Sequence, residues 1–147
     1  MTSRKIVNLG LLLIYLSLSS SVLGPGKCTG DEEYNRGLNN IGNFRLIKDY
    51  RVSLKKGKTE SFQISLTRGL KYKFYTVDNP DNKGKMVMTI YMKPDNNMKL
   101  ASTQSSTSLK HYPSIEFECG KSGKYYLEIH IEGDEKGCGV GMFTVAK

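Results

Sequence analysis

The sequence predicts an all-β fold: an antiparallel β-sandwich or jelly roll of about eight strands, preceded by an N-terminal signal helix. Apolar and polar residues alternate at period two through most of the chain beyond residue 43, which indicates strands with one buried face. Turn-forming clusters interrupt this alternation about every 8–12 residues, the spacing typical of sandwiches. No segment after residue 40 keeps a helical period, so helices are not expected in the domain.

Residues 1–24 are predicted to be a secretory signal peptide. A basic start is followed by the mainly apolar stretch 6–18 and then by small residues. Val22 and Gly24 fit the pattern that a signal peptidase recognises, and cleavage after Ser21 is the alternative. An uncleaved membrane anchor is disfavoured, because a spanning helix needs about 20 apolar residues. We therefore expect a secreted or periplasmic protein with no transmembrane span after cleavage.

Residues 25–43 are predicted to form an irregular N-terminal arm. They are polar and rich in Gly and Asn, and a short helical turn at 32–36 is the alternative. The β-sandwich domain is then expected over residues 44–147.

The first three expected strands are 50–54, 62–66 and 70–75, and they are separated by turns at 55–58 and 67–69. In each strand a large apolar residue occupies every second position, as Tyr50, Val52 and Leu54 do. A dense cluster of Asp, Asn, Pro and Gly at 78–84 marks the turn that follows.

The remaining five strands show the same alternation. They are expected at 86–92, 98–101, 115–119, 125–131 and 140–145. A turn at 93–97 and a Ser/Thr-rich loop at 102–108 flank the short strand 98–101. Further turns at 120–123 and 133–137 bound the strand 125–131.

The charge of the chain does not indicate nucleic-acid binding. The formal net charge is +8, and Arg4 and Lys5 fall in the signal peptide, which leaves 8 − 2 = +6 on the mature chain. The lysines are scattered and interrupted by acids, with no Arg-rich block, so we interpret the charge as a contribution to solubility. Export also argues against a nucleic-acid partner, and a protein, a peptide or an envelope glycan is expected instead.

The chain has three cysteines, and export into an oxidising compartment predicts one disulfide. In a plain meander Cys119 and Cys138 would lie at opposite ends of the strand 125–131, about 20 Å apart at about 3.3 Å per residue. A disulfide needs Cα atoms within about 7 Å. The predicted pairing is therefore Cys28 with either Cys119 or Cys138.

Two strands carry a resemblance to a known family. The segments 69–74 and 123–129 resemble the "G-x-x-Y-x-F" and "G-x-Y-Y-L-x-V" strands of bacterial pre-peptidase C-terminal domains, and 90–101 is similar to the stretch between them. The segment 137–141 is also similar to the ends of small exported proteins of Gram-negative bacteria. The first resemblance implies a non-catalytic β-sandwich accessory of a secreted enzyme.

No catalytic or metal-binding motif is predicted, and no cofactor is expected. His130 stands between Glu128 and Glu132 on a polar strand face, which is more often a solvated surface than a metal or acid–base site. His111 is expected in a loop without a partner. Asp78 and Asp81 lie in a turn that could hold calcium weakly, although the EF-hand spacing is absent.

The candidate binding patch is aromatic and basic. Tyr75, Tyr91 and Tyr126 fall on the polar phase of three strands. If those strands were neighbours, the tyrosines would form an exposed patch with Lys71 and Lys73 that suits a glycan, peptide or protein.

The sequence thus favours an exported, non-enzymatic β-sandwich that binds or assembles at the cell envelope or outside the cell. A small secreted hydrolase or metal-dependent enzyme using His130 and nearby carboxylates is one alternative. An accessory or inhibitor of a separately encoded secreted peptidase is the other, and it rests on the resemblance alone.

Overall fold

A computed structural model describes residues 29–92, 98–133 and 136–147 of the chain. It confirms the all-β prediction: one short helix, α1 (Asp31–Asn39), precedes eight strands, and each predicted strand is present. The strands are β1 (Phe44–Lys55), β2 (Thr59–Leu66), β3 (Lys71–Asp78), β4 (Lys85–Tyr91), β5 (Lys99–Ser102), β6 (Ser114–Glu118), β7 (Gly123–Glu132) and β8 (Lys136–Ala146). The predicted signal peptide and Cys28 lie outside the described residues.

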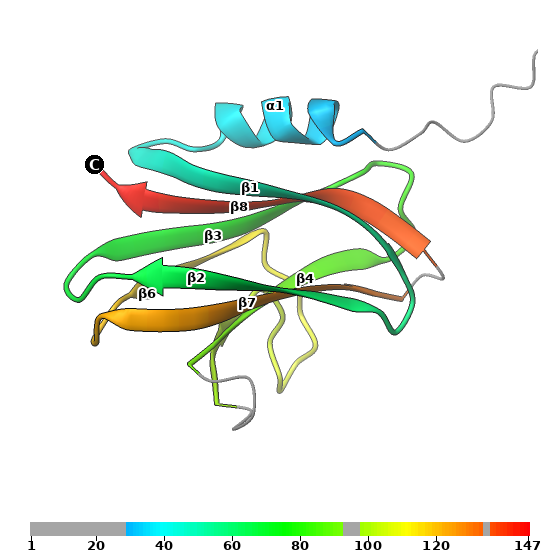
Figure 1. Ribbon diagram of the computed structural model, residues 1–147. Coiled ribbons are helices and arrows are strands. Elements are labelled where there is room, and N and C mark those ends of the chain that lie inside the picture. Colours follow the sequence, from blue (N-terminus) through cyan, green and yellow to red (C-terminus); the bar gives the residue numbers. More distant parts are fainter. Residues whose placement is uncertain (1–28, 93–97, 134–135) are drawn as a thin grey trace, which may run out of the picture.

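The strands form two packed antiparallel sheets of four strands each (Figure 1). The order in the first sheet, sheet A, is β1-β8-β3-β6, and the order in the second, sheet B, is β2-β7-β4-β5. Each strand of the first half pairs with its counterpart from the second half: β1 with β8, β2 with β7, β3 with β6 and β4 with β5. This is the strand order of a jelly roll, one long hairpin folded over into two sheets.

The core lies between the sheets and is built from the apolar positions of the alternating pattern. Phe74 of β3 stacks on Phe143 of β8, with ring centroids 5.0 Å apart and planes 4° from parallel. Leu127 and Ile129 of β7 face them from sheet B and are fully buried. Period-two alternation places these side chains on the inner faces.

Strand β8 carries three glycines at alternate positions, Gly137, Gly139 and Gly141. A Cβ on Gly141 would lie 2.4 Å from Cε of Met88, and a Cβ on Gly139 would lie 2.5 Å from the carbonyl oxygen of Val77. The glycines therefore leave room for side chains of sheet B and for the neighbouring backbone. This packing explains the glycine-rich segment noted in the sequence.

The arm that was expected to be irregular contains the nine-residue helix α1, which covers the outer face of sheet A (Figure 1). Tyr34 and Leu38 pack on the buried side chains of Val140 and Met142 from β8. Gly37 allows this close approach, since a Cβ there would lie 2.3 Å from Sδ of Met142. The helix is thus stabilised by a second, smaller apolar cluster on the far side of the sheet.

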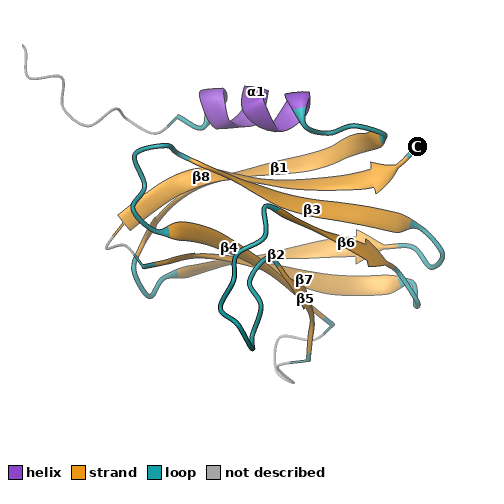
Figure 2. Cartoon of the chain, turned by 180° about the vertical axis from the view of Figure 1, so that it is seen from behind, coloured by secondary structure: helices purple, strands orange, loops and turns teal. Residues whose placement is uncertain are grey.

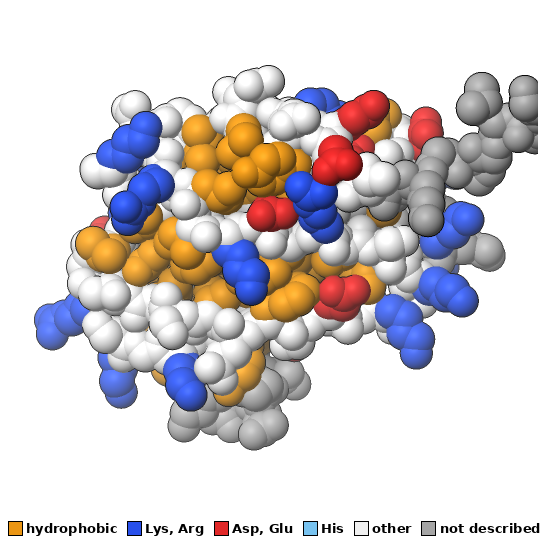
Figure 3. All heavy atoms as spheres, turned by 45° about the horizontal axis from the view of Figure 1, so that its top comes forward, with side chains coloured by type: hydrophobic (Ala, Val, Ile, Leu, Met, Phe, Trp, Pro, Cys, Tyr) orange, Lys and Arg blue, Asp and Glu red, His pale blue; other side chains and the backbone are white. Residues whose placement is uncertain are grey.

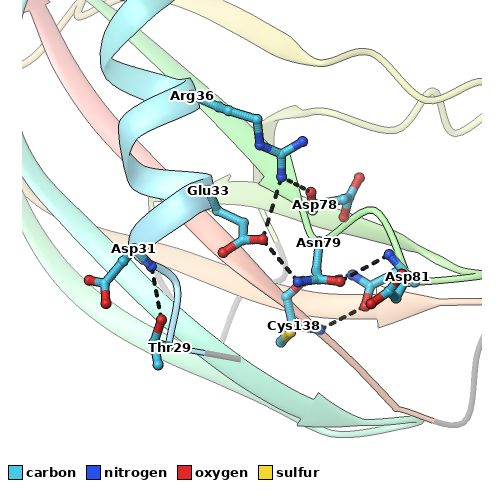
Figure 4. Close-up of polar contacts among 9 residues, drawn as sticks. Thr29, Asp31, Glu33, Arg36, Asp78, Asn79, Asp81 and Cys138 are labelled. Carbon is cyan, nitrogen blue, oxygen red and sulfur yellow. Dashed lines mark hydrogen bonds and ion pairs between the residues drawn. The ribbon is translucent and has the colours of Figure 1, made fainter. Parts of the chain in front are cut away.

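A polar cluster fastens α1 to the turn between β3 and β4 (Figure 4). The carboxylate of Glu33, a residue only 2% exposed, accepts a hydrogen bond from Nδ2 of Asn79 at 2.9 Å and pairs with Arg36 at 3.4 Å. Arg36 also donates to the carbonyl oxygen of Asp78 at 2.8 Å. A buried carboxylate requires such partners, so these contacts fix the helix on the sheet.

Within the three described ranges, no helix is long and apolar enough to cross a membrane.

Candidate functional site

The three tyrosines of the predicted patch do not lie on one surface. Tyr91 and Tyr126 are paired across β4 and β7 and lie half-buried on the outer face of sheet B. Tyr75 belongs to sheet A, is 5% exposed beneath α1, and donates from its hydroxyl to the carbonyl oxygen of Gly37 at 2.9 Å. The alternation identified the outward phase correctly, but the tyrosines occupy different sheets and the helix covers one of them.

The two lysines of the predicted patch also lie on sheet A. Lys71 forms an ion pair with Glu116 at 2.5 Å, and the hydrogen bond from that pair raises the pKa of Lys71. The Nζ atom of Lys73 lies 5.5 Å from the ring centroid of Phe44 and 5.9 Å from that of Tyr75. Neither lysine can join Tyr91 and Tyr126 in one contact surface.

His130 lies half-buried on the outer face of β7. Burial lowers its pKa below 6.5. Glu132 and Glu128 of the same strand act in the opposite direction, while Lys99 of β5 and His111 add to the lowering. The imidazole is therefore neutral at pH 7.

Protonation of His130 is expected to destabilise the fold. The unfolded histidine titrates near 6.5 and the folded one lower, so the unfolded chain binds more protons in that interval. The free energy of unfolding should therefore decrease as the pH falls below about 6.5 and level off below the folded pKa. In His130→Gln this decrease should be smaller, as measured by urea unfolding between about pH 5 and 8. Identical pH profiles for the two proteins would contradict this assignment.

His111, expected to be without a partner, lies beside Glu132 of β7. Its Nε2 atom is 3.1 Å from Oε2 of Glu132, and Gln104 donates to the same oxygen. The Nδ1 atom of His111 is buried and has no hydrogen-bond partner. The contact with Glu132 thus joins residues 104 and 111 to sheet B.

The described part of the chain contains no cluster of metal-ligating side chains for the metal-dependent alternative. No three or more His, Cys, Asp or Glu residues there are placed so that they could hold a metal ion. Asp78 accepts a hydrogen bond from the backbone N–H of Met86 at 2.7 Å, and burial raises its pKa. The backbone N–H of Asp81 donates to Oδ1 of Asn79 at 2.9 Å. Weak calcium binding at Asp78 and Asp81 stays a prediction for titration calorimetry.

The loop between β5 and β6, residues 103–113, projects from the sandwich and is called the β5–β6 loop below (Figure 2). Its two sides pair with each other. The N–H of Tyr112 donates to the carbonyl of Thr103 at 2.7 Å, and the N–H of Ser105 donates to that of Lys110 at 2.9 Å. A bridge between Gln104 and His111 lies between these two contacts. The loop is thus a small hairpin with a paired stem.

The base of this loop is fixed to sheet B. Thr103 is fully buried, and its N–H donates to the carbonyl of Met88 at 2.9 Å. Its side-chain Oγ1 accepts from the N–H of Met88, also at 2.9 Å. Together with the contacts to Glu132, these bonds fix both sides of the stem.

The β5–β6 loop carries exposed apolar groups that sequence reasoning missed, Leu109 at its tip and Tyr112 at the base of its stem. Leu109 is 64% exposed, and it is the non-glycine residue of the described chain with a positive φ, 55°. Tyr112 is also exposed, and Nζ of Lys110 lies 5.4 Å from the centroid of its ring. The available signal was a large apolar residue in a Ser/Thr-rich loop, outside any alternating segment.

Cys119 and Cys138 lie near opposite ends of β3. Cys119 is a buried free thiol next to Leu70, and its Sγ lies 3.1 Å from the carbonyl oxygen of Lys121. Cys138 pairs with Asn79, at the other end of β3. The two ends are on the order of 30 Å apart at about 3.3 Å per residue. Cys119 and Cys138 are therefore too far apart to form a disulfide with each other.

We expect a disulfide between Cys28, outside the described residues, and Cys138. The chain that follows Cys28 runs beside β8, since a Cβ on Gly30 would lie 3.2 Å from Cγ2 of Val140. Cys28 precedes Gly30 by two residues, which span at most about 7 Å, so the position of Gly30 favours Cys138 as the partner. Peptide mapping of the mature protein without reductant should give a Cys28–Cys138 link, with Cys119 alkylated only after unfolding. A link to Cys119 would contradict this prediction.

Comparison with known proteins shows a similar fold among solved structures. No family model matches the chain, and no curated protein matches it. The resemblance to pre-peptidase C-terminal domains therefore has no support beyond the β-sandwich class. Among solved structures, the chain is similar to PliG of Aeromonas hydrophila, described as a periplasmic lysozyme inhibitor of g-type lysozyme. The TM-score is 0.51 at 8% identity, over 68% of this chain and 85% of that one.

Proposed function

We propose that this chain is an exported, non-enzymatic binding protein that inhibits an enzyme outside the cytoplasm, and that the enzyme is a g-type lysozyme. The jelly-roll similarity to PliG, itself a periplasmic inhibitor, is the observation that carries the proposal. The predicted signal peptide agrees with it, since such an inhibitor must leave the cytoplasm to meet its target.

Two features of the sandwich support a binding role. The β5–β6 loop presents exposed apolar groups on a paired stem, an arrangement suited to contact with a protein. The histidines are used for structure: His111 contacts Glu132, and His130 is half-buried and neutral. Of the interpretations drawn from the sequence, the inhibitor is favoured, with a lysozyme in place of a peptidase as its target.

An inhibition assay tests the proposal. The mature protein, purified after export, is added to a g-type lysozyme, and the lysis of bacterial cells is followed by turbidity. Dose-dependent and saturable inhibition is expected, with a lysozyme of another type as the specificity control. An unchanged rate of lysis at a large excess of this protein would overturn the proposal. The same assay with a secreted peptidase separates the two classes of target.

A further inference from the structure

We infer that the β5–β6 loop is the part of the protein that enters the active-site cleft of the inhibited enzyme. Leu109 would fill an apolar subsite, and Lys110 would face the catalytic carboxylates. This inference rests on the proposed function and assigns it to named residues.

The backbone of Leu109 points to a role beyond folding. A φ of 55° places this residue in the left-handed region, which bulky L-residues rarely occupy and which costs conformational energy. The side chain gains no burial in return, because it is 64% exposed. Strained residues persist where the surrounding structure imposes them, and they cluster at ligand-binding sites.

The surroundings of Leu109 impose that conformation. Its N–H donates to the carbonyl of Ser105 at 3.0 Å, and the N–H of Ser108 donates to Oγ of Ser105 at 3.1 Å. The next residue, Lys110, accepts from the N–H of Ser105. Leu109 is therefore held outward at the end of a paired stem, so little conformational entropy remains to be lost when it binds.

The charge of the loop fits a cleft that carries carboxylates. Residues 103–113 contain Lys110 and no Asp or Glu. Glycoside hydrolases, the class to which lysozymes belong, use a pair of Asp or Glu residues at the bond that they cleave. Lys110, next to the apolar tip, would then face the catalytic carboxylates. The ring of Tyr112 holds the ammonium group of Lys110 in place through a cation–π contact.

The other exposed surfaces offer less. Hydrophobic side chains are visible beside α1 and along one side of the sandwich, with Lys and Arg between them (Figure 3). Ile47, 47% exposed, lies at the irregularity of the edge strand β1, and nothing in the described structure shows what would cover it. Tyr91 and Tyr126 lie on a half-buried sheet face that does not project.

The test compares loop variants of the exported protein in the lysozyme assay. Leu109→Asn removes the apolar side chain, while Asn tolerates the left-handed backbone, so folding should be unchanged or slightly improved. The inhibition constant is expected to rise about tenfold or more. Leu70→Asn is the matched control, because Leu70 is 43% exposed at another turn, and it should inhibit as the parent does.

A charge variant tests the second contact. Lys110→Gln should weaken inhibition severalfold at low salt, and the difference from the parent should shrink at high salt because of screening. Lys121→Gln, at an exposed lysine of the β6–β7 turn, should leave inhibition unchanged.

The outcomes separate the loop from the function. A parent protein that does not inhibit overturns both proposals. A parent that inhibits together with a Leu109→Asn variant that inhibits equally overturns the loop alone. Weaker inhibition by Leu109→Asn, with an unchanged unfolding midpoint and a normal Leu70→Asn control, supports the assignment.

Discussion

Gly139→Ala is expected to destabilise the protein by about 3 kcal/mol, the upper end of the usual cost of overpacking. The added Cβ would lie 2.5 Å from the carbonyl oxygen of Val77 and 3.3 Å from the Cα of Asp78. Both atoms belong to the backbone of β3, which pairs with β8 at this point and cannot move alone. Urea unfolding should show the loss as a lower midpoint with a similar slope.

A loss of stability would be the opposite of what a Gly→Ala exchange usually causes. Ala restricts the unfolded chain more than Gly does, so the exchange is favourable wherever the native backbone accepts it. Gly120→Ala is the matched control, since a Cβ there meets nothing within 4 Å. It should change the free energy of unfolding by less than about 0.5 kcal/mol. Equal stability of the two variants would show that β8 tolerates a side chain at position 139.

Phe74→Ala is expected to cost about 3–5 kcal/mol of folding free energy. The Phe74 ring is fully buried and lies beside Tyr72 and Phe143, with centroid distances of 6.4 Å and 5.0 Å. Its loss leaves a cavity between the two sheets, beneath the paired strands β3 and β8, which cannot easily move together to fill it. Thermal and urea unfolding of the purified variant measure the effect.

A conservative exchange at the same position gives the comparison. Phe74→Leu keeps most of the volume and should cost less than half as much, about 1.5 kcal/mol. Similar losses for Leu and Ala would mean that the aromatic stack itself, rather than the filled volume, stabilises the core. No loss for Ala would contradict the burial of this ring.

The strands were predictable because burial in a sandwich imposes period two on the sequence. The ends of the strands were harder to predict than the strands themselves, and β1 shows why. It was expected at 50–54 and begins at Phe44. The register shifts between Leu46 and Lys48, where Ile47 is unpaired, and this irregularity shifts the alternation by one residue. A pattern that changes phase inside a strand is not recognised as one strand.

The sequence offered a helical turn at 32–36 only as the alternative to an irregular arm, and the full helix escaped prediction because its stability depends on tertiary contacts. Nine residues are too few for a stable isolated helix. What stabilises α1 is the contact of Tyr34 and Leu38 with sheet A and the hydrogen bond from Asn79 to the buried carboxylate of Glu33. These partners are distant in sequence, on β8 and on the turn after β3, whose arrangement was unknown from the alternation.

The candidate site was missed for a related reason. Alternation tells which face a side chain takes, but not which sheet its strand joins, so Tyr75 was grouped with Tyr91 and Tyr126. The β5–β6 loop has no period, and both the contact of His111 with Glu132 and the positive φ of Leu109 depend on the folded chain. Without the strand order, the sequence could not show that His111 lies beside Glu132 or that Tyr75 lies in a different sheet from Tyr91 and Tyr126.

The place of β8 in sheet A governs when the protein can fold. The last of the eight strands lies between β1 and β3 and pairs with both. Phe44 meets Ala146, 146 − 44 = 102 residues along the chain, and contacts that close such long loops form slowly. Until β8 emerges from the ribosome, β1 and β3 lack the strand that lies between them and joins them in sheet A. Sheet A can therefore be completed only after the chain has been synthesised through β8, so the sandwich forms late and as a whole rather than strand by strand.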